Sequence, residues 1–139
     1  MSKKLVDMLN KALEQEHACS IRYATHAATV TGPYAETVAA RLKEISGDEV
    51  LHAEMLRDRI LTLGGTPSMQ VSAEDLKYAD NLEDMLAINI DEEKHAIKVY
   101  LTILRDIPED NIILRRCIED IIRDEQEHLE ELENLTAHA

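Results

Sequence analysis

Two segments of the sequence place a glutamate and a histidine three residues apart, each directly after an aspartate. Residues 48–52 read Asp-Glu-Val-Leu-His, and residues 124–128 read Asp-Glu-Gln-Glu-His. On an α-helix, a step of three residues brings two side chains onto one face about one turn apart, so a carboxylate and an imidazole can bind the same metal ion. Each segment is therefore a candidate half of a metal site.

The same spacing occurs twice more, in Glu14 with His17 and in Glu92 with His95, so spacing alone does not select the ligands. Helical phase separates the pairs, because each residue advances about 100° around the helix axis. Glu49 falls close to the centre of the apolar stripe of its helix, whereas Glu14 points almost the opposite way. We predict that the two rival pairs lie at the surface and that each helix places one acid in the core: Glu16, Glu49, Glu93 and Glu125.

Four carboxylates in one core require compensation, because burying an unpaired carboxylate costs enough to force its protonation. Two divalent cations would neutralise four carboxylates, and His52 and His128 would complete the ligand set. Carboxylate oxygen and imidazole nitrogen suit iron or manganese, and the lack of thiolates argues against a structural zinc site. The competing interpretation, buried ion pairs, needs basic partners on the same faces, and only Arg22, Arg41 and Arg59 come near.

The composition fits one acidic helical domain. The 139 residues carry a formal net charge of -13, which argues against binding to nucleic acid or to an anionic membrane and favours cations as partners. There is no Trp or Phe, and Gly and Pro are few, which favours long helices over strands. We expect a single cytoplasmic domain over residues 1–139, because no apolar run forms a signal peptide or a membrane span and two cysteines are too few for a disulfide scaffold.

Three clusters of helix-breaking residues divide the chain into four amphipathic segments. Apolar residues recur three and four positions apart in each segment, which predicts four helices. Two of the gaps are so short that they can only join antiparallel neighbours, whereas the gap from Gly65 to Ala79 is long enough to run down the side of a bundle. The predicted fold is all-α, a four-helix bundle with one long crossover between helices two and three, over segments 3–30, 34–63, 81–105 and 109–135.

Residues at the segment ends predict where the helices begin. Pro33 and Pro108 are placed for the first turns of the second and fourth helices, where a proline costs no hydrogen bond. Asp80 with Glu83 three residues later forms a plausible capping box for the third helix.

The two halves of the chain repeat one arrangement of acid and tyrosine. Tyr23 follows Glu16 by seven residues, and Tyr100 follows Glu93 by seven. A step of seven residues keeps two side chains on one helical face, so both tyrosines are expected near the buried acids. Packing in the core is the commoner role for such tyrosines, and participation in redox chemistry is the alternative.

Other polar side chains receive roles from their positions. Asp48 and Asp124 each precede a core glutamate, and they are candidates to accept the outer N–H of a ligand histidine across the bundle. Cys19 is expected to be a small buried side chain, and its distance along the bundle axis from Cys117 disfavours a disulfide. His26 and His95 are interpreted as surface residues.

Five stretches carry a likeness to a known family: residues 9–16 (LNKALEQE), 48–53 (DEVLHA), 59–67 (RILTLGGTP), 83–86 (EDML) and 122–128 (IRDEQEH). With these stretches the sequence resembles bacterioferritin over nearly the whole of its length, which implies a ferritin-like bundle. The family's di-iron ferroxidase ligands would fall on Glu16, Glu49, His52, Glu93, Glu125 and His128.

The resemblance also implies roles for these residues. Glu49 and Glu125 would bridge the two metals, and Glu16 and Glu93 would be terminal ligands. The tyrosine that lies beside the ligands in the family matches Tyr23, which is therefore the catalytic candidate outside the ligand set.

Two departures from the family pattern limit what the resemblance implies. Val50 replaces the methionine that ligates haem at the family's dimer interface, so we expect no haem. The chain ends at Ala139, without the short fifth helix that lines pores in the family's shell. Storage of a mineral therefore stays open, and we expect a homo-oligomer of at least two copies.

The predicted function is that of a di-iron ferroxidase, which binds two Fe(II) ions and oxidises them with dioxygen or peroxide in iron detoxification or storage. Manganese or zinc would be substitutes at the same donors. Two alternatives stay open. One is a non-catalytic metal-binding or scaffold bundle that holds its metal statically, and the other is a di-iron or manganese enzyme that consumes peroxide or oxygen.

Overall fold

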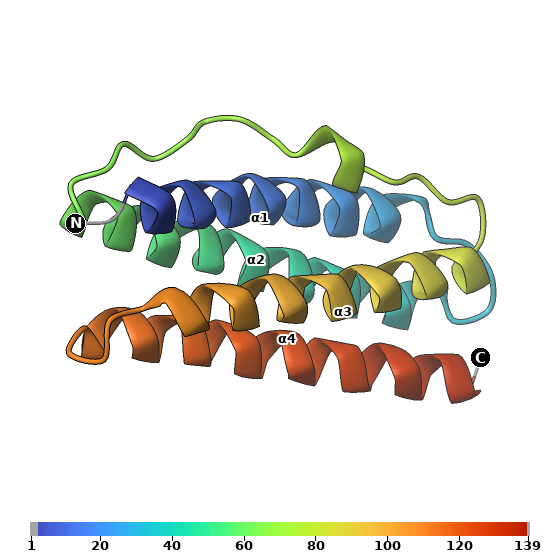
Figure 1. Ribbon diagram of the computed structural model, residues 1–139. Helices are drawn as coiled ribbons and strands as arrows, with labels where there is room; N and C mark the ends of the chain where they lie inside the picture. Colours follow the sequence, from blue (N-terminus) through green and yellow to red (C-terminus); the bar gives the residue numbers. More distant parts are fainter. Residues whose placement is uncertain (1–2, 139) are drawn as a thin grey trace.

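The structure, a computed structural model, describes residues 3–138 and consists of four long helices. Helix α1 spans Lys3–Thr29, α2 Ala35–Thr62, α3 Leu82–Asp106 and α4 Ile112–His138, and a short 3-10 turn, η1, spans Ala73–Asp75. Helices α1 and α2 form one hairpin and α3 and α4 the other, while the crossover from α2 to α3 runs back along α1 (Figure 1). No strand occurs within the described residues. The predicted all-α bundle with one long crossover is confirmed.

Two helix ends follow simple local rules. Gly64 ends α2 with a positive φ of 85°, a conformation that glycine adopts without steric cost. Its neighbour Gly65 passes so close to α1 that a Cβ there would lie 2.5 Å from Val6 Cγ1, so this point of the chain requires glycine. At the start of α4, the side chain of Asn111 accepts a hydrogen bond from the N–H of Leu114 at 3.2 Å.

The helix starts differ from those expected. Pro33 and Pro108 both precede their helices and do not occupy the first turns. The capping box predicted at Asp80 is also wrong, because Asn81 is the N-cap of α3 and accepts from the N–H of Asp84 at 2.8 Å. Asparagine caps a helix as well as aspartate does, and the backbone of Asn81 is extended, with φ -147°, as a cap requires.

Side chains from successive turns of α1 fasten the crossover to the bundle. Asn10 accepts from the N–H of Ser68 at 2.8 Å, and the Ser68 hydroxyl donates to the Glu14 carboxylate at 2.6 Å. One turn further, the ring of His17 bonds the carbonyl of Gln70 at 2.6 Å. Glu14 and His17 are therefore half-buried anchors of the crossover, and the prediction that this pair lies at the surface is wrong.

The core consists of two apolar layers with a polar level between them. On every helix, the residues of the two layers lie on either side of the predicted ligands in the sequence. One layer includes Leu9, Leu56, Ile103 and Ile118, and the other includes Ala27, Leu42, Leu86 and Leu132. Both layers exclude water from the level between them. None of the helices in the described part of the chain is long and apolar enough to cross a membrane.

Candidate metal centre

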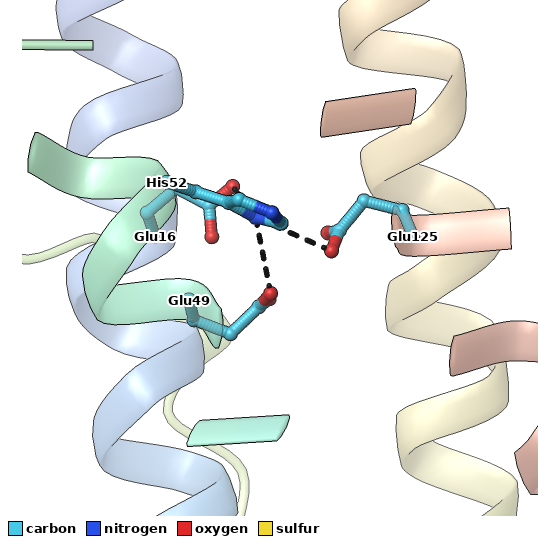
Figure 2. Close-up of side chains that lie close together, drawn as sticks. All are labelled: Glu16, Glu49, His52 and Glu125. Atoms are coloured by element: carbon cyan, nitrogen blue, oxygen red, sulfur yellow. Dashed lines mark ion pairs between the residues drawn. The ribbon is translucent and has the colours of Figure 1, made fainter. Parts of the chain in front are cut away.

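The four helices bring their core acids and two histidines to the middle level of the bundle. Helical periodicity places these residues there, because each lies on the apolar stripe of its own helix. All six side chains are buried, with exposed fractions of 0–2%. Figure 2 shows one part of the cluster, in which side chains from opposite sides of the bundle approach one another. The burial that helical phase predicts is confirmed for Glu16, Glu49, His52, Glu93, Glu125 and His128.

The six residues form two groups of donor atoms that share two members. In each group the donor atoms all lie within 4.8 Å of one another, a spacing that fits a single ion at the centre of each group. Glu49 and Glu125 belong to both groups. The first group adds Glu16 and His52, and the second adds Glu93 and His128.

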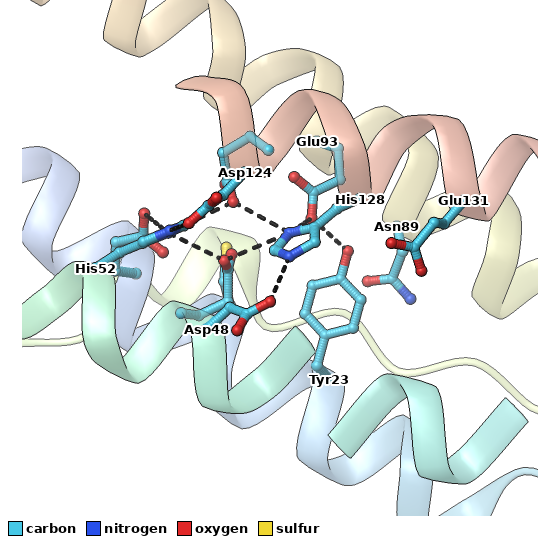
Figure 3. Close-up of polar contacts among 12 residues, drawn as sticks. Tyr23, Asp48, His52, Asn89, Glu93, Asp124, His128 and Glu131 are labelled. Carbon is cyan, nitrogen blue, oxygen red and sulfur yellow. Dashed lines mark hydrogen bonds and ion pairs between the residues drawn. The ribbon is translucent and has the colours of Figure 1, made fainter. Parts of the chain in front are cut away.

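Each histidine ring turns one nitrogen toward the carboxylates and the other toward an aspartate of the opposite hairpin. His52 Nδ1 lies 3.3 Å from Glu49, while its Nε2–H donates to Asp124 at 2.9 Å. In the same way, His128 Nε2–H donates to Asp48 at 2.8 Å (Figure 3). The outer partners predicted for the two histidines are confirmed. An aspartate in this position fixes the tautomer that leaves Nδ1 free to bind a metal.

The two core tyrosines also bond across the hairpins. Tyr23 O–H donates to Glu93 Oε2 at 2.6 Å, and Tyr100 O–H donates to Glu16 Oε2 at 2.5 Å. Each tyrosine therefore contacts the acid of the other hairpin and not the acid seven residues before it on its own helix. In both acids the second oxygen, Oε1, has no hydrogen-bond partner.

Burial and mutual repulsion make the cluster retain protons. Burial, together with the carboxylates of Glu16 and Glu93, raises the pKa of Glu49 to about 8, and burial raises the pKa of Glu125 well above its usual range. Burial opposes the charged form of His52, but the nearby carboxylates of Glu16 and Glu49 outweigh that effect and raise its pKa to about 12. A metal ion must displace these protons in order to bind.

The chemistry of the cluster fits two divalent cations. Buried polar atoms normally have partners, and each one left without a partner costs free energy. Among the side chains that the structure describes, every buried nitrogen or oxygen without a partner belongs to this cluster. These atoms are Glu16 Oε1, both oxygens of Glu49, His52 Nδ1, Glu93 Oε1, Glu125 Oε1 and His128 Nδ1.

A second buried polar cluster lies beside the first, and the sequence prediction missed it. Arg22 donates through Nε to Asn89 at 2.9 Å and lies 3.7 Å from the carboxylate of Glu92. Asn89 also bonds the ring of His26 at 2.9 Å, and that ring contacts the carbonyl of Lys77 in the crossover at 2.8 Å. The cluster therefore joins α1, α3 and the crossover.

The predictions that His26 and Glu92 lie at the surface are wrong, because their exposed fractions are 0% and 6%. A signal for His26 was available, since it follows Tyr23 by three residues and so continues the same apolar stripe. Glu92 has no such signal. Its burial depends on Arg22 and Lys77, which come from distant parts of the chain. His95 is exposed, as predicted.

The two cysteines do not join the metal cluster. The thiol of Cys19 accepts a hydrogen bond from Arg22 at 3.5 Å, and burial raises its pKa well above the usual range. Both Cys19 and Cys117 are free, in agreement with the expected lack of a disulfide between them.

A bundle with one long crossover, in which each helix buries a carboxylate and two helices add a histidine, is the architecture of ferritin-like carboxylate proteins. Comparison with known families agrees, because the ferritin-like domain model matches residues 6–139. The chain belongs to the ferritin-like domain family.

Individual relatives support the resemblance to bacterioferritin. The bacterioferritin of Desulfovibrio desulfuricans is 33% identical over 137 residues, which cover 97% of this chain and 75% of the relative. A crystal structure of a ferritin-like di-iron carboxylate protein from Bacillus anthracis matches with a TM-score of 0.91 at 34% identity, over 98% of this chain and 99% of the other. An X-ray structure of Desulfovibrio desulfuricans bacterioferritin, described with its di-iron site in different catalytic states, also matches. The TM-score is 0.87 at 29% identity, and the match covers 97% of this chain and 79% of the other.

Proposed function

We propose that this chain is a ferritin-like di-iron ferroxidase, which binds two Fe(II) ions and oxidises them with dioxygen or peroxide in iron detoxification or storage. The observation that carries the proposal is the set of buried donor atoms without partners, to which all four helices contribute. The di-iron site described for the bacterioferritin of Desulfovibrio desulfuricans supports iron as the metal. Manganese and zinc accept the same donors and would be substitutes.

The geometry supports a division of the ligands into bridging and terminal ones. Glu49 and Glu125 are the proposed bridging ligands, because each belongs to both groups of donor atoms. The proposed terminal ligands are Glu16 with His52 at one position and Glu93 with His128 at the other.

The residues around the ligands orient them and keep the site dry. Asp124 and Asp48 hold the two histidine rings, and the apolar layers above and below exclude water. Tyr23, the catalytic candidate of the sequence, is proposed to act by positioning Glu93, with which it shares a hydrogen bond. Iron bound here supplies the electrons that reduce the oxidant.

The test is oxidation of stoichiometric Fe(II). Anaerobic protein that receives about two Fe(II) per chain and then air or peroxide is expected to develop ferric absorbance at least about tenfold faster than a His52→Ala variant. The variant lacks the buried nitrogen donor of His52, so one of the two metal-binding positions loses a ligand. Stopped-flow absorbance measures the rates, and equilibrium dialysis measures the metal content.

His95→Ala is the matched control, because His95 has the same spacing from a glutamate but is exposed. Its oxidation rate should equal that of the unaltered protein. If the protein binds two metals yet oxidises Fe(II) no faster than buffer does, the proposal is wrong and a static metal site replaces it.

We expect the purified protein to lack haem. Val50 lies half-exposed on α2, with 50% of its surface accessible, and its side chain has no donor atom for iron. Even after growth with excess haem precursor, the protein should show no Soret band. A Soret band that survives purification would contradict this expectation.

We also propose that the chain forms a homo-oligomer of at least two copies and is cytoplasmic. Exposed apolar side chains support self-association, because Ile21 and Met69 line one surface hollow and are 46% and 94% exposed. The two free cysteines are in keeping with a reducing compartment.

A further inference from the structure

We infer that Tyr100 is a positioning residue of the metal centre, which holds the Glu16 carboxylate from the opposite hairpin in a metal-binding orientation. The inference rests on the proposed function, because the position of this carboxylate matters only if the cluster binds metal. It concerns a residue on α3 that supplies no donor atom to either group.

The contact between Tyr100 and Glu16 is direct and buried. The phenol O–H donates to Glu16 Oε2 at 2.5 Å, and both side chains are 2% exposed. Glu16 belongs to the donor group that includes His52, its Oε2 lies 3.5 Å from His52 Nδ1, and its Oε1 has no hydrogen-bond partner. Because a glutamate side chain has several rotatable bonds, a hydrogen bond that fixes the carboxylate reduces the entropy lost when the carboxylate binds an ion.

The same contact occurs at the equivalent point of the other half. Tyr23 donates to Glu93 at 2.6 Å and leaves Glu93 Oε1 without a partner (Figure 3). Packing of the core requires only the aromatic rings, and phenylalanine would provide them. Packing therefore does not explain why both hydroxyls bond an acid of the cluster, Glu93 or Glu16.

The surroundings of the two tyrosines differ in a way that makes Tyr100 the cleaner test. The guanidinium of Arg22 lies over the Tyr23 ring, 5.3 Å from its centroid, so a change at Tyr23 also disturbs a buried cation. The residue that precedes Tyr100 is Val99, which is uncharged. Tyr100→Phe thus removes one hydroxyl without disturbing a buried cation such as the one that precedes Tyr23.

The experiment is an anaerobic titration of the full chain with Co(II), whose visible absorbance reports the number and type of ligands. The unaltered protein is expected to bind two ions. Tyr100→Phe should bind one of them about tenfold more weakly, the usual cost of losing a hydrogen bond to a ligand. Tyr78→Phe, in which the altered ring is 65% exposed, is the control and should give the unaltered isotherm.

Double variants distinguish positioning from a general effect on the core. In a Glu16→Gln protein, the carboxylate that Tyr100 positions is already lost, so adding Tyr100→Phe should lower the Co(II) affinity little further. In a Glu93→Gln protein, Tyr100→Phe should still lower the Co(II) affinity about tenfold. Circular dichroism and thermal unfolding of each variant establish that the chain is folded.

The outcomes separate the inference from the proposed function. If the unaltered protein binds no Co(II) pair, the proposed function is wrong and the inference fails with it. If it binds two ions and Tyr100→Phe gives the same isotherm, only the inference is wrong. If Tyr100→Phe lowers the Co(II) affinity equally in the Glu16→Gln and Glu93→Gln proteins, Tyr100 acts through packing. This result would also overturn the inference.

Discussion

Replacing Glu49 with alanine is expected to abolish binding of a metal pair. Both oxygens of Glu49 are buried without a partner, and the residue belongs to both donor groups, so its loss removes a ligand from each position. Equilibrium dialysis of anaerobic protein against Fe(II) or Co(II) should show the metal content fall from about two ions per chain to less than one. An affinity loss of at least about 100-fold per position is expected, since each also loses a neutralising charge. Glu125→Ala should behave in the same way.

Two variants serve as controls for this prediction. Glu14→Ala removes an acid with the same sequence spacing to a histidine, but this acid bonds Ser68 in the crossover and lies outside both donor groups. His95→Ala removes an exposed ring. Both variants should keep two ions. Equal metal loss in the Glu14 and Glu49 variants would contradict the assignment of ligands by helical phase.

Helical phase was sufficient to find the four acids of the metal cluster, because a single helix determines which of its side chains share a face. Glu16 and Glu93 lie on the apolar stripes of their helices, and the structure buries both to 2% exposure. Chain connectivity was sufficient for the topology, because a gap of a few residues permits only an antiparallel neighbour. These parts of the fold depend on local geometry, and the sequence contains that information directly.

Contacts between distant segments were harder to predict. Periodicity places Tyr23 on the correct face but does not reveal that its hydroxyl bonds Glu93 on α3. The burial of Glu92 likewise depends on Arg22 from α1 and on Lys77 from the crossover. A long connection without apolar periodicity carries no signal for its path, so the anchoring of the crossover along α1 appears only in the structure.

The metal-free protein is expected to lose stability as the pH rises from about 6 to about 9. Hydrogen bonding and proximity to carboxylates overcome the effect of burial and raise the pKa of His128 from 6.5 to about 9. A histidine with a raised pKa stabilises the folded chain fully below its unfolded pKa, and this contribution is lost as the pH rises through the folded pKa. Burial raises the pKa of Glu49 to about 8, so ionisation of this carboxyl also penalises the folded chain as the pH rises from 4.5 to 8. The loss of protons from His128 and from Glu49 therefore lowers the stability of the folded chain in both cases.

Bound metal is expected to remove most of this loss, because cations replace the protons that the cluster retains. Between pH 6.5 and 8.5, His128 alone accounts for a loss of about 2 kcal/mol, which lowers the melting temperature by roughly 5–10 °C. Zn(II) or Co(II) at about 1,000 times its dissociation constant adds about 4 kcal/mol per site. Because metal competes with protons for these ligands, a fixed metal concentration should raise the melting temperature more at pH 8.5 than at pH 6.5. Scanning calorimetry with and without metal measures both effects, and His95→Gln, which alters an exposed ring, should reproduce them. A metal-free melting temperature that stays constant over this range would contradict the prediction. It would mean that the buried cluster does not retain protons, and stabilisation by cations would then not depend on pH.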